Sequence, residues 1–201
     1  MNAKYEFVAG DEITIAPGRT LKRIRALVSI SYFVSTGALG GYIESEKCLD
    51  VSGNAWVYGN AQVSGDARVH GDARVSGDAQ VYGDAWVSGN AQVSGNAWVY
   101  GNAQVSGNAR VHGNAQVSGN AQVSGDGLIF WASKVGRENG TLTVYNTKEN
   151  ELEVTRGCFK GSVDEFLKAS EEKHDDQTHQ EYRLLIEVAH SRITRARKDA
   201  K

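Results

Sequence analysis

The chain of 201 residues carries a formal net charge of −2, and 23 glycines stand against a single proline. This length allows one domain of average size, or a scaffold with small additions at its ends. The chain has no apolar run of about twenty residues, which excludes a membrane-spanning helix, and its near-neutral charge excludes a nucleic-acid-binding surface along the whole chain.

The cysteine content and the first residues bear on the compartment. Two cysteines, Cys48 and Cys158, are too few for a disulfide framework. The first residues, Met1 to Glu6, lack the apolar core of a signal peptide. We therefore expect a reduced, cytoplasmic protein.

Residues 1–50 are predicted to form an N-terminal β cap. Strands are expected at Glu12–Ile15, Thr20–Ser29 and Ser31–Val34. Such a cap is needed because an open β-helix exposes unpaired strand edges at each end. The Gly40-Gly41 pair lacks the spacing of a phosphate-binding loop, so we interpret it as a bend into the next segment.

Residues 51–127 consist of repeated hexads. Thirteen consecutive hexads begin with valine, from Val51 to Val123. In the segment Ala55-Trp56-Val57-Tyr58, strand alternation directs alanine and valine to one face, and tryptophan and tyrosine to the other. The Gly-Asn or Gly-Asp pair that follows tolerates positive φ and forms a tight corner. Three such hexads close one triangular coil. The pattern predicts a parallel β-helix of about four coils, with an antiparallel hairpin array as the alternative.

The hexads resemble those of the hexapeptide-repeat family, in which an aliphatic residue is followed by a small residue, two variable residues and another small residue. Val51 and Ala55 match the inward positions, whereas Ser52, Tyr58 and His70 depart from the small residue usual at the second position. The resemblance implies a left-handed β-helix and a homotrimer. It implies no particular activity, because one fold hosts many functions.

An internal duplication distributes the outward side chains. Val51–Gln80 and Val93–Gln122 are identical at 26 of 30 positions, and the offset of seven hexads is two coils plus one face. Each copied side chain therefore reappears on the next face of the prism, and the tryptophans point in three directions. Because stacking neighbours are three hexads apart, Trp56 is expected beside Arg74, Arg68 beside Trp86, and Tyr82 beside Tyr100. Exposed aromatic side chains mark binding sites, so the candidate ligand- or partner-binding residues are Trp56, Arg74, Arg68, Trp86, Trp98, Tyr82 and Tyr100. The alternative is that these rows support adjacent coils or the seam of a trimer.

Four successive corners carry aspartates. Asp66, Asp72, Asp78 and Asp84 occupy them, and Asp66 stacks on Asp84. A divalent cation can bridge such a pair. Aspartate and asparagine are interchangeable at these corners, however, so we predict no metal site.

Residues 128–201 are predicted to form a small C-terminal α+β domain. Strands are expected at Leu128–Ser133, Thr141–Tyr145 and Glu151–Thr155. A capping box from Ser162 to Glu165 predicts a helix to about Ser170. A second box beginning at Thr178 predicts a helix to about Arg195 with one packed face, formed by Tyr182, Leu185, Ile186, Ala189 and Ile193.

Both flanks resemble parts of phage proteins. The stretches Arg19–Leu27 and Leu39–Glu46 resemble the head of hexapeptide-repeat proteins common in phages and prophages, which are generally labelled transferase-like from the repeat alone. The stretch Arg156–Phe166, with Glu181-Tyr182 downstream, resembles a small C-terminal domain recurrent in phage proteins. These resemblances imply a protein that acts in the cytoplasm of a bacterial host.

Two weaker features lie in the C-terminal segment. Cys158 is a candidate nucleophile, with His174, His179 or His190 as its base, but no spacing supports such a pair and a buried structural cysteine is the commoner case. The basic tail, formed by Arg192, Arg195, Arg197, Lys198 and Lys201, is interpreted as a solvated helix end, with a phosphate-binding arm as the alternative.

Two functions stand foremost, and nucleic-acid contact through the basic C-terminal helix or a structural role in a virion are further alternatives. The one we favour is a trimeric, non-enzymatic scaffold without a cofactor that sequesters a host signalling ligand or inhibits a host defence protein. The alternative is an acyltransferase that uses acetyl-CoA, with His70 or His112 as general base. The uninterrupted hexads disfavour the enzyme, because no loop leaves the coil to enclose an acceptor.

Overall fold

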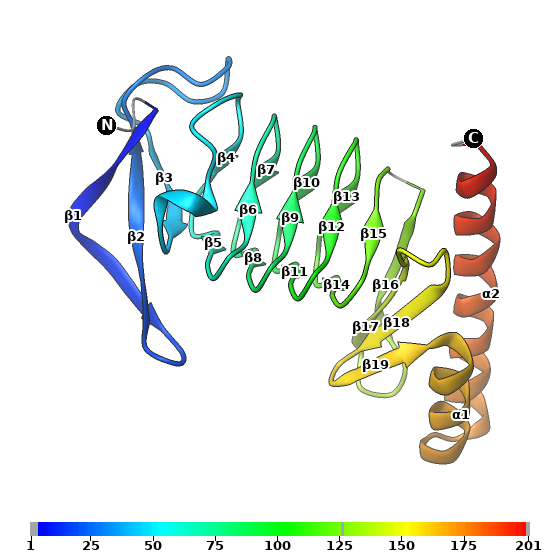
Figure 1. Ribbon diagram of the computed structural model, residues 1–201. Coiled ribbons are helices and arrows are strands. Elements are labelled where there is room, and N and C mark those ends of the chain that lie inside the picture. The colour runs from blue at the N-terminus through cyan, green and yellow to red at the C-terminus, as the bar shows by residue number, and fades with distance from the viewer. Residues whose placement is uncertain (1–3, 126, 200–201) are drawn as a thin grey trace.

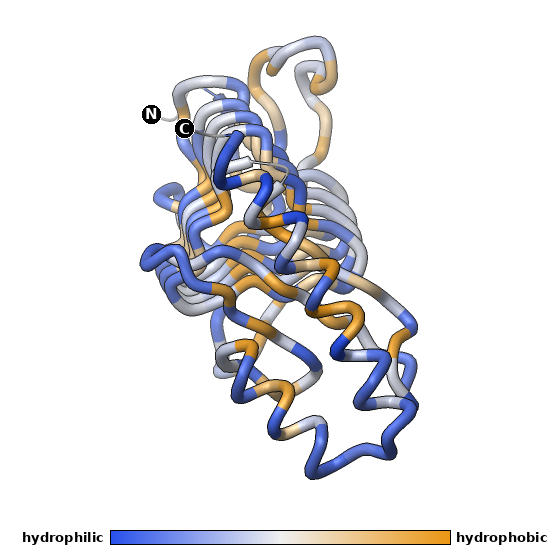
Figure 2. The backbone as a smooth tube through the Cα atoms, turned by 90° about the vertical axis from the view of Figure 1, so that its right-hand side faces the viewer, coloured by the Kyte–Doolittle hydropathy of each residue, from blue (hydrophilic) through white to orange (hydrophobic). Residues whose placement is uncertain are grey.

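A computed structural model of the chain describes residues 4–125 and 127–199. The hexads form a parallel β-solenoid that separates an N-terminal β hairpin from a C-terminal region of four strands and two helices (Figure 1). Seen from the end, the coils superimpose and their hydrophobic positions fall in line (Figure 2). The protein is mainly β, as predicted.

Each hexad contributes a two-residue strand to one of three walls. One wall contains β4, β7, β10 and β13, a second contains β6, β9, β12 and β15, and the third contains β5, β8, β11 and β14. Parallel partners are three hexads apart, as between Val57 and Val75, so the predicted coil length is confirmed. The strands are β4 (Trp56–Val57), β5 (Gln62–Val63), β6 (Arg68–Val69), β7 (Arg74–Val75), β8 (Gln80–Val81), β9 (Trp86–Val87), β10 (Gln92–Val93), β11 (Trp98–Val99), β12 (Gln104–Val105), β13 (Arg110–Val111), β14 (Gln116–Val117) and β15 (Gln122–Val123).

Along the hexads, the solenoid interior is formed by their alanine and valine rows. Every alanine from Ala55 to Ala121 and every valine from Val57 to Val123 is buried. Burial of one valine side chain stabilises the fold by about 1.5–3 kcal/mol. Val51 is the exception, with 54% of its surface exposed, because the regular coil begins one hexad after the repeat does.

The corners differ from the expectation in one respect. Only glycine adopts positive φ there, as at Gly77 with φ +71°. The residue after it instead forms a ladder between coils: the Asn54 side chain donates to Asp72 Oδ1 at 2.7 Å, and the Asn96 side chain donates to Asn114 Oδ1 at 3.2 Å. Aspartate and asparagine are interchangeable because both accept in this ladder.

The N-terminal segment extends the third wall and adds a turn. Strand β1 (Tyr5–Ile15) pairs antiparallel with β2 (Arg19–Ala26), which pairs antiparallel with β3 (Leu39–Ile43). Strand β3 then runs parallel to β5, with Tyr42 opposite Gln62. Leu49, which follows the short 3-10 helix η1 (Glu46–Cys48), forms a parallel bridge to Val69. The solenoid therefore has about five turns, one more than the hexads alone suggested.

Two details of this segment were predicted wrongly. The expected strand Ser31–Val34 is reduced to an isolated bridge between Ile30 and Val34. The Gly40-Gly41 pair is no bend but lies within β3, where a Cβ atom on Gly41 would come within 2.5 Å of the Ala61 carbonyl oxygen. Glycine is required there because the strand lies directly on the second coil.

The C-terminal region forms an antiparallel sheet covered by helices. Its strands are β16 (Ile129–Val135), β17 (Gly140–Asn146), β18 (Leu152–Arg156) and β19 (Phe159–Ser162), and its helices are α1 (Val163–Lys173) and α2 (Asp176–Asp199). The capping box of Ser162 and Glu165 is confirmed. Strand β19 was not predicted. Helix α2 begins earlier than expected because Asp175, not Thr178, caps it: the Asp175 carboxylate accepts from the Thr178 backbone N–H at 2.8 Å.

The packed face of α2 was predicted correctly. Tyr182, Ile186, Ala189 and Ile193 are buried, and Leu185 is partly buried against the same core. The helix packs on β16 and β17. Tyr182 also meets Phe166 of α1 edge-on, with ring centroids 5.1 Å apart. These contacts join the two helices to the sheet in one core.

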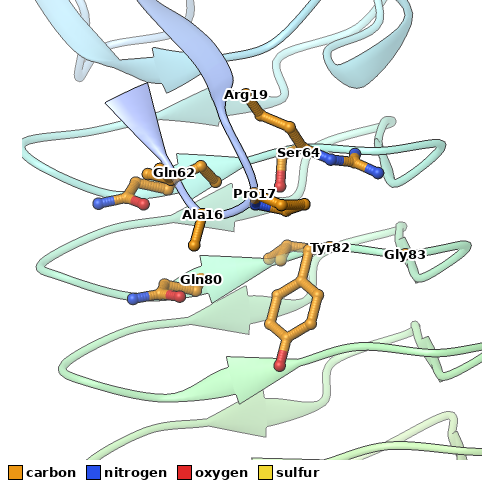
Figure 3. A pocket seen from close by; sticks show the side chains of 10 residues that line it. Ala16, Pro17, Arg19, Gln62, Ser64, Gln80, Tyr82 and Gly83 are labelled. Carbon is orange, nitrogen blue, oxygen red and sulfur yellow. The ribbon is translucent and has the colours of Figure 1, made fainter. Parts of the chain in front are cut away.

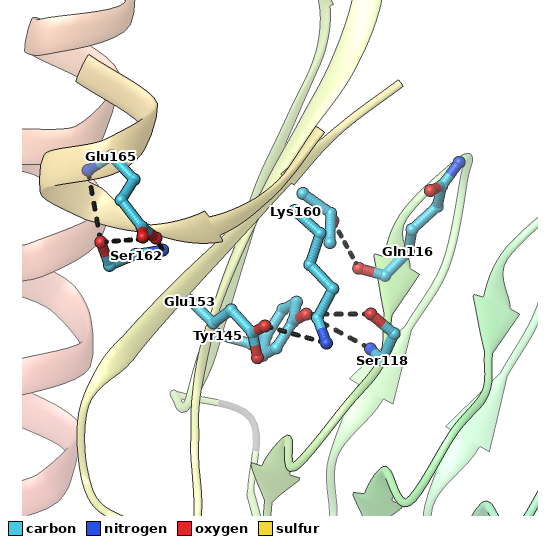
Figure 4. Close-up of polar contacts among 8 residues, drawn as sticks. Gln116, Ser118, Tyr145, Glu153, Lys160, Ser162 and Glu165 are labelled. Atoms are coloured by element: carbon cyan, nitrogen blue, oxygen red, sulfur yellow. Dashed lines mark hydrogen bonds and ion pairs between the residues drawn. The ribbon is translucent and has the colours of Figure 1, made fainter. Parts of the chain in front are cut away.

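Side chains of the flanking segments satisfy the backbone groups that the end coils leave unpaired. At the first turn, the Tyr5 hydroxyl donates to the Leu49 carbonyl at 3.1 Å and Lys4 Nζ donates to the Asp50 carbonyl at 2.8 Å. At the last turn, the Gln116 N–H donates to Thr143 Oγ1 at 3.1 Å and the Ser118 N–H donates to the Tyr145 hydroxyl at 3.4 Å. Thr155 Oγ1 donates to the Gln116 carbonyl at 2.7 Å. Figure 4 shows this end, where Lys160 also pairs with Glu153 at 3.0 Å.

We expect Gly77→Ala to destabilise the solenoid more than Gly157→Ala. Both residues have positive φ, which costs alanine about 1–2 kcal/mol. Only at Gly77 would the new Cβ lie 3.0 Å from the backbone of Gly95, whereas nothing lies within 4 Å at Gly157. Crowding adds about 1–3 kcal/mol, so the midpoint of urea unfolding should fall further for Gly77→Ala. Equal shifts would contradict the crowding between coils.

We expect Tyr145→Phe to cost about 1–2 kcal/mol, because it leaves the Ser118 N–H without its partner in a buried position. Burial raises the pKa of Tyr145, so the phenol stays protonated. Tyr82→Phe is the matched control, since the Tyr82 hydroxyl makes no hydrogen bond to any residue that the structure describes. Urea unfolding of both variants checks this, and a loss of equal size in Tyr82→Phe would refute the role of the Tyr145 hydroxyl.

Candidate functional site

Two grooves of similar size lie where the N-terminal segment overhangs the walls of the solenoid. The first has a volume of about 670 Å³ and lies between the β1–β2 turn and the wall of β5 and β8. The second has a volume of about 660 Å³ and lies between the η1 segment and the wall of β6 and β9. We name them the Tyr82 groove and the Trp86 groove after the aromatic residue that lines each.

The Trp86 groove brings together three residues that the sequence singled out. Arg68 and Trp86 are direct partners in the parallel register of β6 and β9, and the Arg68 guanidinium carbon lies 5.6 Å from the centre of the Trp86 ring. His70 meets the same ring edge-on, with centroids 5.9 Å apart. The expected pairing of Arg68 with Trp86 is confirmed. The groove is lined by Glu46, Lys47, Leu49, Asp50, Val51, Arg68, Val69, His70 and Trp86.

In the Trp86 groove a carboxylate is held by hydrogen bonds, whereas two cations form no ion pair with any residue that the structure describes. The Asp50 carboxylate accepts from the Ser52 N–H at 3.0 Å and from the Ser52 hydroxyl at 2.7 Å, and these bonds lower the pKa of Asp50. Within residues 4–125 and 127–199, neither Arg68 nor Lys47 forms an ion pair. Trp86 is 44% exposed. The groove therefore offers an accessible indole ring next to cations that no carboxylate neutralises directly.

The Tyr82 groove has a different chemistry. Its floor carries Gln62, Ser64, Gln80 and Tyr82, and Pro17 of the β1–β2 turn lies over it (Figure 3). Its cation is neutralised, because Arg19 Nη1 lies 3.0 Å from Glu44 Oε2. The groove is lined by Ile15, Ala16, Pro17, Arg19, Gln62, Ser64, Gln80, Val81, Tyr82 and Gly83.

An aromatic ladder leads out of the Tyr82 groove. The rings of Tyr82 and Tyr100 are stacked, with centroids 5.0 Å apart and planes inclined by 4°, which confirms their expected pairing. Trp98 meets Tyr82 edge-on at 6.4 Å. Desolvation, with a smaller contribution from Tyr100, raises the pKa of Tyr82, so the phenol remains a neutral hydrogen-bonding group.

The expectation that Trp56 lies on the surface is wrong. Trp56 and Arg74 are partners in the register, but Trp56 is only 1% exposed because the N-terminal segment covers it, with the Tyr5 ring edge-on at 6.3 Å. The Arg74 guanidinium lies instead over the Phe33 ring at 4.1 Å. Tryptophans do lie on all three walls, as predicted, but of Trp56, Trp86 and Trp98 only the last two are accessible.

The two candidate base histidines lie in different surroundings. His70 lines the Trp86 groove. His112, its copy in the duplication, packs edge-on against Trp131 of β16 with centroids 4.3 Å apart. Their roles in acyl transfer stay predictions, and within one chain they do not belong to a common site.

Other candidates are distributed over the C-terminal end. Cys158 is exposed, which contradicts the expectation of a buried cysteine, and it lines a smaller cavity of about 220 Å³ together with Arg156 and His174. Of the basic tail, Arg197 is used in packing, since its Nε donates to Asn146 Oδ1 at 2.7 Å. Lys201 lies outside the described residues.

The described residues hold neither a metal-binding cluster nor a membrane-spanning helix. No group of three or more histidine, cysteine, aspartate or glutamate side chains is placed to hold a metal ion in those parts of the chain. None of the helices there is long and apolar enough to span a bilayer.

From the sequence, only the solenoid-wall side of each groove could be predicted, and the residues that the N-terminal segment contributes could not. The wall residues could be found, because the spacing of three hexads places Gln62 beside Gln80 as it places Tyr82 beside Tyr100. Pro17, Arg19, Lys47 and Asp50 could not, since no local pattern shows which wall the N-terminal segment covers.

The repeats match a known family model. Five overlapping stretches match the YdcK beta solenoid repeat, at residues 61–77, 67–83, 79–93, 91–105 and 103–119. No curated protein matches the chain. The matches and the fold agree that this is a repeat β-solenoid protein.

We expect the hydrogen bonds of Asp50 to make folding stability depend on pH in the acid range. The pKa of Asp50 is lowered in the fold, so its contribution is present above the unfolded value of about 3.9 and is lost as the pH falls below it. Ser52→Ala removes the main cause, and the variant should lose less stability between pH 5 and pH 3, taken roughly as the window around that value. Urea unfolding across this range is the measurement, and an unchanged slope in Ser52→Ala would contradict the assignment.

Proposed function

We propose that this β-solenoid protein is a non-enzymatic binding scaffold and that the Trp86 groove is its ligand site. The observation that carries the proposal is the pair of Arg68 and the accessible Trp86 ring, 5.6 Å apart in a groove of about 660 Å³. Ligand pockets of this size combine apolar or aromatic walls with a few placed polar groups.

The chemistry of the groove favours a small ligand with a flat ring and an anionic group. An indole offers a face for ring stacking, and a guanidinium pairs with phosphate through two parallel hydrogen bonds. Lys47 and His70 lie at the same groove and add positive charge or hydrogen-bond donors. A nucleotide signal of the host has both required parts.

We further propose the oligomeric state, the origin and the compartment that the sequence resemblances imply. The protein is a homotrimer of left-handed hexapeptide-repeat solenoids of phage origin, and it sequesters the signal in the cytoplasm of a bacterial host. The hexads support the solenoid type and the trimer through their resemblance to the hexapeptide-repeat family, and both flanks support the phage origin through their resemblance to parts of phage proteins. In the other form of this proposal, a host defence protein binds the same wall in place of a small ligand and is inhibited.

The acyltransferase remains the second candidate, because His70 lies in a groove and a general base needs such a place. Against it, the hexads from Val57 to Val123 contain no inserted loop, so no loop extends from the solenoid wall to enclose an acceptor substrate. Acetyl-CoA would be the acyl donor.

We expect Arg68→Ala to weaken the binding of a nucleotide probe about 10- to 150-fold, the loss of a charge-assisted hydrogen bond of about 1.5–3 kcal/mol. The probes are ATP, cyclic AMP and cyclic di-AMP, measured by titration calorimetry. Arg110→Ala is the matched control, since Arg110 is the copy of Arg68 in the duplication and is exposed on another wall. The absence of binding by all three probes, or equal losses in both variants, would overturn the ligand site.

Acetyl-CoA and assembly are tested separately. If the protein turns over acetyl-CoA with an amine or hydroxyl acceptor, and His70→Ala abolishes this activity, the acyltransferase function would replace the proposed scaffold function.

The oligomeric state is tested by native mass spectrometry, which should give three times the chain mass of 21.7 kDa. A monomer mass would refute the trimer and leave the groove proposal standing, because all lining residues of the groove belong to one chain.

A further inference from the structure

The wall of β5, β8 and β11 carries two parallel rows of side chains that the proposed function does not use. One row contains Gln62, Gln80 and Trp98, which are successive partners in the register. The second row, two residues further along each hexad, contains Ser64, Tyr82 and Tyr100. Neighbours in each row are separated by the strand spacing of about 4.8 Å. The rows therefore form a track that follows the solenoid axis from the Tyr82 groove.

The aromatic part of the track is held rigidly. Tyr82 stacks on Tyr100 at 5.0 Å, and Trp98 meets Tyr82 edge-on at 6.4 Å. Each ring also extends from or directly follows a strand that is paired on both sides. Trp98 remains 39% exposed. Rigid aromatic side chains offer contact area at a low cost in conformational entropy.

The polar part of the track is free to bind a ligand. Among the residues that the structure describes, the side-chain amides of Gln62 and Gln80 make no hydrogen bond. Each amide offers two N–H donors and a carbonyl acceptor. Figure 3 shows both glutamines on the floor of the groove, with Ala16 and Pro17 of the β1–β2 turn beside them.

Charge and backbone pairing exclude two other classes of ligand. The cation of the groove, Arg19, is paired with Glu44 at 3.0 Å, and Glu44 also accepts from the Gly65 N–H at 2.6 Å, so an anion finds no unpaired cation here. A peptide cannot be added as a further strand, because the wall already uses its backbone groups: the Gln62 N–H donates to the Ala79 carbonyl at 2.9 Å.

We propose that this track binds a neutral, linear oligosaccharide that lies along the solenoid axis, from the Tyr82 groove toward Trp98. A sugar ring has an apolar C–H face that packs on an aromatic ring. The hydroxyl groups at its edge both donate and accept, as the glutamine amides do. A chain of sugars presents these features repeatedly, and so does the stack of coils. The site shares no residue with the Trp86 groove.

Saturation-transfer NMR with maltohexaose, cellohexaose and the hexamer of N-acetylglucosamine tests the proposal. We expect transfer to the ring C–H protons of at least one probe, and an affinity that does not change between low and high salt, because no ion pair forms. Tyr82→Ala and Trp98→Ala should each weaken binding about fivefold, the size of one aromatic contact.

Three variants provide the controls. Trp86→Ala lies in the other groove and should bind the probe as the unchanged protein does. Tyr82→Phe keeps the ring and should retain most of the affinity that Tyr82→Ala loses, which separates loss of the contact from loss of the fold. Urea unfolding reports whether Tyr82→Ala is still folded.

Absence of transfer to all three hexasaccharides would overturn the proposal, and so would an equal loss of affinity in Trp86→Ala and Trp98→Ala. Tighter binding of an acidic oligosaccharide, weakened by salt, would also overturn it by showing that charge determines recognition. None of these results bears on the nucleotide site, because ATP would be measured with Arg68→Ala in a separate titration.

Discussion

The parallel hydrogen bonding between successive coils, which pairs each hexad with the third one after it, is the constraint on which the rest of this structure depends. It buries one alanine and one valine per hexad and aligns the outward side chains in rows. It also leaves unpaired backbone groups at both ends, and unpaired groups in a buried position are costly. The N-terminal segment supplies Lys4 and Tyr5 to the first turn, and the C-terminal sheet supplies Thr143, Tyr145 and Thr155 to the last. Such capped ends also prevent one solenoid from extending another by strand pairing.

The need for a cap explains where the grooves are. A plain solenoid wall is nearly flat, because every hexad has the same length. The β1–β2 turn and the η1 segment reach over two of the walls, and each encloses a groove between cap and wall. The N-terminal segment that closes the first turn of the solenoid therefore also creates its concave surfaces. On the wall of β4 and β7 the N-terminal segment buries Trp56 and leaves Arg74 against Phe33.

The two grooves differ in chemistry because different hexads lie beneath the N-terminal segment. Because the copies are shifted by two coils and one face, Arg68 lies under the cap while its copy Arg110 is exposed further along another wall. Trp86 belongs to neither copy and lies beside Arg68, whereas Tyr82 and Tyr100 form the ladder near Trp98. One groove thus combines an indole with cations, and the other combines phenols with neutral amides. This difference is the physical basis for assigning them different ligands.

The sequence by itself determined the coil: its length of three hexads, its interior, its glycine corners, and the pairs Arg68–Trp86 and Tyr82–Tyr100. These follow from a local period, which repeats the same contact in every turn. The tertiary structure decided the burial of Trp56, the place of Gly40-Gly41 inside β3, the exposure of Cys158 and the cap side of both grooves. Each of these depends on how a flanking segment folds and which surface it covers. That choice is made by contacts between residues far apart in the chain, such as Tyr5 with Trp56, and no periodic pattern within either segment encodes it.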